Sequence, residues 1–171
     1  MARMFGRRRS IIKDALMGAM AGGVATAVMG PAMRRLQRLE RPSAKALEKS
    51  VGPAEPAVEK VARKVAEPLG IGLDSEERKN AGEAVHWTYG IFWGAVFGVL
   101  HDRVPIPPLL HGLLFGAALG VLSETAVLPA LKLAAPANAY PVDTHLAGLA
   151  SHLIYGATAE RSYTLFKRVL S

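Results

Sequence analysis

The sequence predicts an all-α integral membrane protein, a four-helix bundle that forms one domain over residues 1–171. Half of the residues are hydrophobic, the charged residues are segregated from the apolar ones, and four long runs carry almost no charge. A helix of about 20 apolar residues crosses the ~30 Å hydrocarbon core of a bilayer. A soluble four-helix bundle would show a charged face on every helix, and the second and third runs have none. The membrane bundle is therefore favoured over the soluble one.

The four runs differ in how well each meets the length of a span. The first, residues 15–33, is long enough but rich in Ala and Gly, whereas residues 84–100 and 104–131 are strongly apolar. The fourth, residues 144–159, is short unless its helix continues through Glu160. We predict that all four are spans.

Arg8 and Arg9, which precede the first run, support another interpretation of that run. The segment from Arg8 to Lys13 resembles a twin-arginine export signal. Cleavage of such a signal would leave three spans. We favour a retained span, because the run has an internal copy later in the chain that cannot be a signal.

Most of the charge lies in a loop insertion, residues 34–81, after the first run. Glu55-Pro56 opens a predicted helix there, since Pro is tolerated at the first helical position. Asp74, followed by Glu77, predicts a capped start for the next long helix. The helix after Pro56 is amphipathic and would either lie on lipid headgroups or dock on the ends of the spans. Its apolar stripe is Val58, Val61, Val65 and Leu69.

The net charge is +7 at pH 7, from 21 Lys and Arg against 14 Asp and Glu. Beside long apolar runs, this excess indicates anionic lipid headgroups at the basic flanks rather than nucleic acid. The basic residues before the first run favour cytoplasmic termini, whereas the basic loop after it favours the opposite orientation. We predict cytoplasmic termini, because the first helix usually dominates.

Glycines recur at a spacing of four, or a multiple of it, in every run. In lipid, helices associate where their backbones approach closely, and glycine permits that approach. The stripes predict a compact bundle, and they also suit a homo-oligomer or a membrane-protein partner. The predicted packing glycines are Gly18, Gly22, Gly90, Gly94, Gly98, Gly112, Gly116, Gly120, Gly148 and Gly156.

The two halves of the chain resemble each other. Gly-Ala at 18–19 recurs at 116–117, and the motif His-x-x-Tyr-Gly occurs at 86–90 and again at 152–156. The offsets are 98 and 66 residues, and their difference of 32 fits an insertion in the first half. We predict two parallel repeats about an axis along the membrane normal. Repeat one covers residues 10–103, including the insertion, and repeat two covers residues 108–170.

Short motifs of the chain also resemble a known family. They are His-Trp-Thr-Tyr-Gly at 86–90 and Ser-His-Leu-Ile-Tyr-Gly at 151–156, with Glu124 and Pro129 between them. These residues are similar to those of the YagU-like bacterial inner-membrane proteins. The resemblance implies a multi-pass protein of the bacterial inner membrane, with no established biochemical activity and an association with acid tolerance. The long charged loop departs from that pattern.

Ionisable side chains inside the apolar runs are the candidates for chemistry, because a bilayer makes them costly unless they face the bundle interior and a partner. Glu124 continues a glycine stripe, His86 heads a second, and His152 lies within a third. We expect the partner of Glu124 to be His152 or His86. His101 and His111 flank a Pro-rich turn and are expected at the membrane interface. The predicted intramembrane polar site is His86, Tyr89, Glu124, His152 and Tyr155.

Three functions fit these residues. In the first, neutral imidazoles and phenols hydrogen-bond across helices and fix their packing. In the second, Glu124 and the pair His86/His152 serve a small proton-linked transporter or channel. In the third, His86 and His152 hold a haem or a metal ion. No enzyme motif and no Cys occur, so we predict a non-catalytic structural, assembly or stress-tolerance protein without a cofactor.

Overall fold

The computed structural model describes residues 11–53 and 55–170, and within them the only regular structure is helical. The all-α prediction is confirmed, while the motif at Arg8-Arg9 lies outside the described residues. The long helices are α1 (Ile11–Leu39), α4 (Ser75–His101), α5 (Pro108–Leu122) and α7 (Val142–Leu170). The short elements are α2 (Pro42–Val51), α3 (Ala57–Ala66), η1 (Glu67–Leu69), η2 (Ser123–Val127), α6 (Leu128–Ala130) and η3 (Ala137–Ala139).

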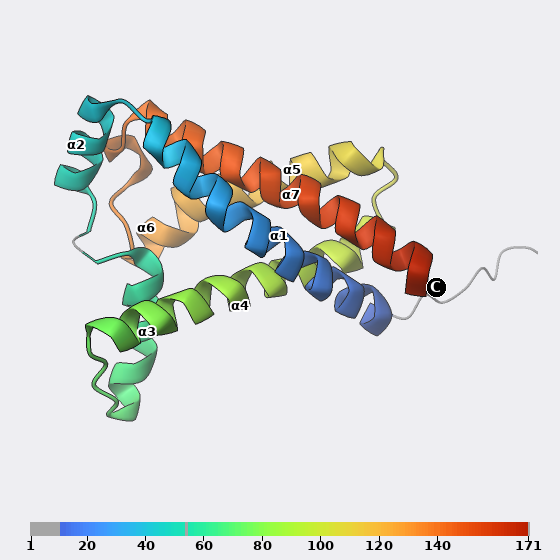
Figure 1. Cartoon of the computed structure of the whole chain (residues 1–171), viewed down its shortest axis with the longest axis horizontal. Helices are drawn as coiled ribbons and strands as arrows, with labels where there is room; N and C mark the ends of the chain where they lie inside the picture. Colours follow the sequence, from blue (N-terminus) through green and yellow to red (C-terminus); the bar gives the residue numbers. More distant parts are fainter. Residues whose placement is uncertain (1–10, 54, 171) are drawn as a thin grey trace, which may run out of the picture.

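The four long helices run back and forth as a bundle (Figure 1). α1 packs against both α4 and α7, and α5 packs against α7. α4 and α5 meet through aromatic rings, with the centroids of Phe97 and Phe115 5.1 Å apart. The start of α1 and the end of α7 lie at one end of the bundle, the terminal end (Figure 1). α2 and α3 lie at the other, the distal end.

α1 and α4 meet backbone to backbone at their glycines. A Cβ added to Gly22 would lie 2.5 Å from the carbonyl oxygen of Gly90 and 2.7 Å from the Cα of Gly94. Gly18 and Gly98 make the same kind of contact closer to the terminal end. Because backbone atoms fill the space, a side chain at these positions would force the two helices apart. The close approach is the one that the glycine stripes predict.

α5 and α7 also meet at glycines, but in another register. A Cβ on Gly112 would lie 2.5 Å from the carbonyl oxygen of Gly156, and one on Gly120 would lie 2.9 Å from the ring of His152. Aligning the two halves of the sequence would pair Gly120 with Glu160, the counterparts of Gly22 and Gly94. Glu160 lies beside Gly112 instead. The two helix pairs therefore differ in register, and the internal duplication stays a prediction.

The charged loop contains two helices where the sequence predicted one. α3 is the expected amphipathic helix, and it docks on α4. Its buried residues are Ala62 and Ala66, whereas Val65 is 62% exposed and Leu69, just beyond it, is 70% exposed. The docking interpretation holds for the helix, but small alanines make the contact rather than the expected valine stripe. α2 was missed; it begins at a proline, whose fixed φ suits a first helical position.

The start of α4 is capped as the sequence predicts. The Asp74 carboxylate accepts hydrogen bonds from the backbone N–H groups of Glu76 and Glu77, at 2.8 and 2.9 Å. The Glu77 carboxylate in turn accepts one from the Asp74 N–H at 2.9 Å. This reciprocal capping box fixes where the helix begins.

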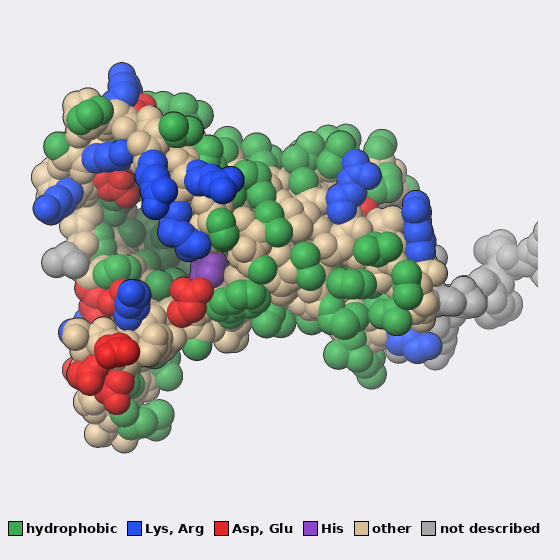
Figure 2. Space-filling model, in the orientation of Figure 1, with side chains coloured by type: hydrophobic (Ala, Val, Ile, Leu, Met, Phe, Trp, Pro, Cys, Tyr) green, Lys and Arg blue, Asp and Glu red, His purple; other side chains and the backbone are tan. Residues whose placement is uncertain are grey.

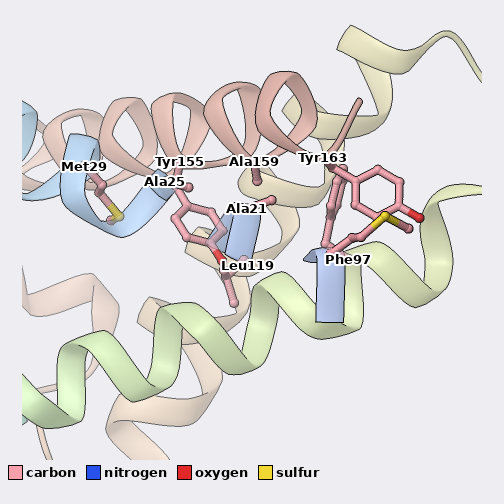
Figure 3. Close-up of a cluster of buried hydrophobic side chains, with 9 residues drawn as sticks. Ala21, Ala25, Met29, Phe97, Leu119, Tyr155, Ala159 and Tyr163 are labelled. Atoms are coloured by element: carbon pink, nitrogen blue, oxygen red, sulfur yellow. The ribbon is translucent and has the colours of Figure 1, made fainter. Parts of the chain in front are cut away.

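The bundle interior is narrow and is filled by small and aromatic side chains. Tyr155 and Tyr163 of α7 reach inward past the alanines of α1, and Phe97 of α4 lies among them (Figure 3). Alanines at these positions leave room for the rings. The buried apolar cluster is Met17, Ala21, Ala25, Met29, Phe97, Leu119, Tyr155, Ala159 and Tyr163.

The outer surface of the bundle is apolar. On α1, Leu16 is 60% exposed and Val28 is 44% exposed; on α5, Leu114 is 53% exposed. Figure 2 shows hydrophobic side chains over the middle of the bundle and basic ones near its two ends. Two stretches of the described chain, Ile11–Leu39 and Pro108–Ala130, are helical, long and apolar enough to cross a membrane.

Candidate functional site

Glu124 lies on a widened turn of helix. The Leu128 N–H donates to the carbonyl of Ser123, five residues earlier, so residues 123–127 form a π-helical turn. Pro129 explains it, because a proline has no N–H and its ring would collide with the carbonyl of Thr125 in a regular α-helix. Such turns often occur at functional sites.

Glu124 pairs with His145 at the distal end. Its Oε2 lies 3.1 Å from His145 Nδ1, and His145 Nε2 lies 2.9 Å from the carbonyl oxygen of Ala137. Gly148 makes room for the carboxylate, since a Cβ there would overlap Glu124 Oε1. The expectation that His152 or His86 pairs with Glu124 is wrong, because the wide turn directs the carboxylate toward the start of α7.

The surroundings of His145 indicate the position of one of its protons. Nε2 faces a carbonyl oxygen, which only accepts, so Nε2 carries a proton. Nδ1 faces an oxygen of the Glu124 carboxylate. The two ring nitrogens thus join the π-helical turn to the carbonyl of Ala137.

The remaining predicted site residues mostly connect helices. The Tyr155 hydroxyl donates to the carbonyl of Gly90 at 2.6 Å, and the Tyr89 hydroxyl lies 2.8 Å from Ser123 Oγ. His152 Nδ1 donates to the Gly148 carbonyl at 2.9 Å, within its own helix. His86 is close enough to His152 to interact electrostatically. His86, His152 and the buried Tyr155 thus lie in one region of the bundle, with the 38% exposed Tyr89 at its edge, and Glu124 belongs to a different pair.

A second polar cluster, at the terminal end, was not predicted. His101, expected at the membrane interface, has a side chain only 12% exposed, and its Nε2 lies 3.0 Å from the carboxylate of Glu160. His101 Nδ1 lies 3.2 Å from Asp102 Oδ1. Asp102 also accepts from Lys167 Nζ at 2.7 Å. The two ring nitrogens of His101 therefore both face carboxylates.

His111 completes this cluster. It is only 7% exposed and stacks on Phe97, with ring centroids 5.1 Å apart. Its Nδ1 is buried and has no hydrogen-bond partner. One ring nitrogen of His111, one of His101 and a carboxylate oxygen of Glu160 lie within 4.8 Å of one another. His111, like His101, is thus buried within the bundle, at the end where α4 and α5 meet their connecting turn, and its depth in the membrane stays a prediction.

The two clusters lie at opposite ends of the bundle, and the interior between them is tightly packed, with polar side chains such as His152 and Tyr155 among the apolar ones. His145 and Glu160 stand on the same helix, about 22 Å apart at 1.5 Å per residue. Between them the interior is occupied by the cluster of Figure 3, in which Ala21, Phe97 and Ala159 are fully buried. Within the described chain, the polar groups thus gather in separate regions along the bundle, with tightly packed side chains between its two ends.

The comparisons with known proteins agree with a chain whose activity is not established. No curated protein and no solved structure matched it. A family match covers residues 62–161, from within α3 to Arg161 in α7, and so includes the histidines and the carboxylates Glu124 and Glu160 of both clusters. The resemblance to YagU-like proteins stays an expectation. By the match over more than half of its length, the chain belongs to the family described as "Protein of unknown function (DUF1440)".

Proposed function

We propose that this chain is a multi-pass protein of the bacterial inner membrane, a four-span bundle with a structural or assembly function and no catalytic step. The inverted distribution of its side chains carries the proposal. Leucines, valines and isoleucines of the long helices point outward, while the interior combines aromatic rings with glycines, alanines and buried polar groups. In water, such an exposed apolar surface is unfavourable and uncommon. In lipid it is the expected arrangement, because tails are as apolar as leucine and polar groups need partners inside.

Buried polar residues strengthen this argument. Thr26, Ser151 and Glu160 are 3%, 0% and 1% exposed, in the same helices that expose leucine and valine. Thr26 and Ser151 satisfy their hydroxyls by donating to the carbonyl one turn earlier, at 2.8 and 2.7 Å. Polar side chains of a membrane bundle are satisfied in this manner. A soluble bundle of similar size would place leucine at such positions.

The four-span topology adds α4 and α7 to the two stretches that are long and apolar enough to cross a membrane, Ile11–Leu39 and Pro108–Ala130. These have 27 and 29 residues, enough to cross about 30 Å of hydrocarbon. Their charges gather at the helix ends, apart from Glu160, which faces inward, and Arg161 beside it. Basic residues at the ends of the bundle, Arg34 and Arg35 among them, would bind anionic headgroups. We keep cytoplasmic termini as part of the proposal.

The function is structural in this proposal because the interior hydrogen bonds tie helices together. Tyr155 joins α7 to α4, and Tyr89 joins α4 to the π-helical turn. The glycine stripes are occupied within the chain, so a homo-oligomer or a membrane-protein partner would use the outward apolar faces. The implied acid-tolerance function would then depend on an intact bundle rather than on a reaction.

The membrane part of the proposal is tested by fractionation. We expect the full chain to stay in the membrane pellet after an alkaline carbonate wash and to be released by detergent. A peripheral membrane protein expressed in the same cells and released by the wash is the control. Recovery in the soluble fraction without detergent would refute the proposal.

One observation favours a proton-linked function as the second candidate, namely the contact of 3.1 Å between the ionisable side chains of Glu124 and His145. The tightly packed interior between the two clusters argues against it. Vesicles that contain the purified chain and a pH-sensitive dye distinguish the two. The structural function predicts the same slow decay of a pH gradient for the wild type and for Glu124→Gln. Faster decay that Glu124→Gln abolishes would establish the proton-linked function instead.

A further inference from the structure

We propose that His101, His111 and Glu160 bind one divalent transition-metal ion at the terminal end, with Zn²⁺ as its representative. The three side chains come from α4, α5 and α7. This site is distinct from the pair His86/His152 that the sequence suggested for a metal.

The donor atoms are nearly in place. The donors of the three residues lie within 4.8 Å of one another, and His101 Nε2 is 3.0 Å from Glu160. Around a tetrahedral ion with bonds of about 2.0–2.2 Å, neighbouring donors are about 3.4 Å apart. Binding would draw the His111 donor toward the pair and so close the remaining gap.

The position of His111 is not explained by the ion pair between His101 and Glu160 alone. Its residue is more than nine-tenths buried, and Nδ1 has no hydrogen-bond partner. A buried polar atom without a partner is costly. The His101–Glu160 pair would be complete without His111. A metal ion in the cluster would give the buried His111 ring a polar partner.

The hydrogen-bond partners that orient His101 and Glu160 are of the kind found around the ligands of metal sites. A metal-binding histidine almost always presents its other ring nitrogen to a carboxylate or a carbonyl. His101 does so through Nδ1, which faces Asp102 at 3.2 Å, and Lys167 holds Asp102 in place. The Glu160 carboxylate accepts a hydrogen bond from Thr164 at 2.8 Å. Both ligands are therefore oriented before an ion arrives.

The donor set selects the class of ion. Two imidazoles and one carboxylate suit Zn²⁺ and related transition-metal ions, whereas Mg²⁺ and Ca²⁺ prefer all-oxygen sites. Three protein ligands leave one position for water or another small ligand. Phe97 stacks on His111 and limits how far its ring turns.

The test uses the full chain without a histidine tag, purified in detergent and stripped with a chelator. Zn²⁺ is titrated in competition with a chromophoric chelator, and the bound metal is counted by elemental analysis. We expect one Zn²⁺ per chain and visible absorption bands when Co²⁺ replaces it. His111→Gln should weaken binding at least 100-fold. Asp102→Asn, which changes only the second layer, should weaken it about 10- to 100-fold.

His86→Gln is the matched control, and it should leave Zn²⁺ affinity unchanged. Absence of stoichiometric binding by the wild type would overturn the proposal, as would loss of binding in His86→Gln instead of His111→Gln. Circular dichroism reports whether each variant folds, and Glu160→Gln is the second ligand variant. If neither ligand variant folds, the wild type decides: Zn²⁺ but not Mg²⁺ must raise its Tm, since only an ion that binds the folded chain stabilises it.

Discussion

Replacing Gly22 by alanine should separate α1 from α4, and Gly23 provides a matched control one residue away. A Cβ on Gly22 would lie 2.5 Å from the Gly90 carbonyl oxygen and 2.7 Å from the Gly94 Cα, short of ordinary contact at 3.4 Å by about 0.7–0.9 Å. A Cβ on Gly23 would meet only the side chain of Ile91, at 3.8 Å. The obstacles at Gly22 are backbone atoms, so the helices themselves must move.

The expected difference follows from two opposing effects. Alanine is favoured over glycine in a helix by about 1 kcal/mol, and this gain is common to both variants. Overpacking costs about 1–3 kcal/mol and affects only Gly22→Ala. Gly22→Ala should therefore be less stable than Gly23→Ala by about 1–3 kcal/mol. At about 2–4 °C per kcal/mol for a chain of this size, the two Tm values differ by several degrees.

Thermal unfolding of both variants, followed by circular dichroism in one detergent, measures this difference. Gly23→Ala should melt at or above the wild-type temperature. Equal melting of the two variants would refute the backbone contact between α1 and α4, and with it the explanation of the glycine stripes.

Three further predictions concern the distal end and the repeat. Glu124→Gln should melt like the wild type because its amide donates to His145 Nδ1. Glu124→Leu should lower the free energy of unfolding by about 1 kcal/mol, the low end for an unpaired polar group, because both side chains are partly exposed. A leucine variant as stable as the wild type would contradict this prediction. Arg41, through its hydrogen bonds and charge, lowers the pKa of Asp143, which precedes the apolar run of α7, to about 2. The pair therefore stabilises the fold fully above the ordinary pKa of 3.8 and progressively less as the pH falls toward 2. Arg41→Gln should lower Tm at pH 6 but not at pH 2, with the exposed Arg35→Gln as control, and an unchanged Tm at pH 6 would count against the pair. His86→Cys and His152→Cys should be labelled from the same side of a vesicle, and labelling from opposite sides would rule out the parallel duplication.

Much of the fold could be predicted because its determinants are local. Uncharged runs, a capping box at Asp74 and glycines at a spacing of four each involve a few neighbouring residues. The register between helices depends on distant contacts instead. Glu160 lies beside Gly112 because α5 and α7 slide until their backbones meet, and no alignment of the two halves encodes that displacement. α2 left a signal that was missed: Pro42 opens it, and Ala44, Leu47 and Val51 recur at spacings of three and four.

The candidate site was only partly predictable for the same reason. Glu124 was singled out by its place on a glycine stripe, but a π-helical turn changes the direction of every residue after Leu122, so its partner is His145. The terminal cluster did leave a signal. His101 and His111 flank a short turn and so lie at the same level, and Glu160 follows Gly156 by one helical turn on the packed face. Those observations concern different helices, and only the packed bundle joins them.

The position of Glu160 also bears on how the bundle is made. In the proposed membrane arrangement, helices enter the bilayer in the order of synthesis, and α7 comes last. His101 ends α4 and His111 lies in the first turn of α5, so both can remain at the membrane surface until α7 is inserted. Glu160 has ten helical residues after it and is made 59 residues later than His101. The Glu160 carboxylate then inserts beside His101 and His111, which are already present in the bundle. A chain cut short before α7 would leave His101 without Glu160 and would leave uncovered the face of α1 on which α7 packs.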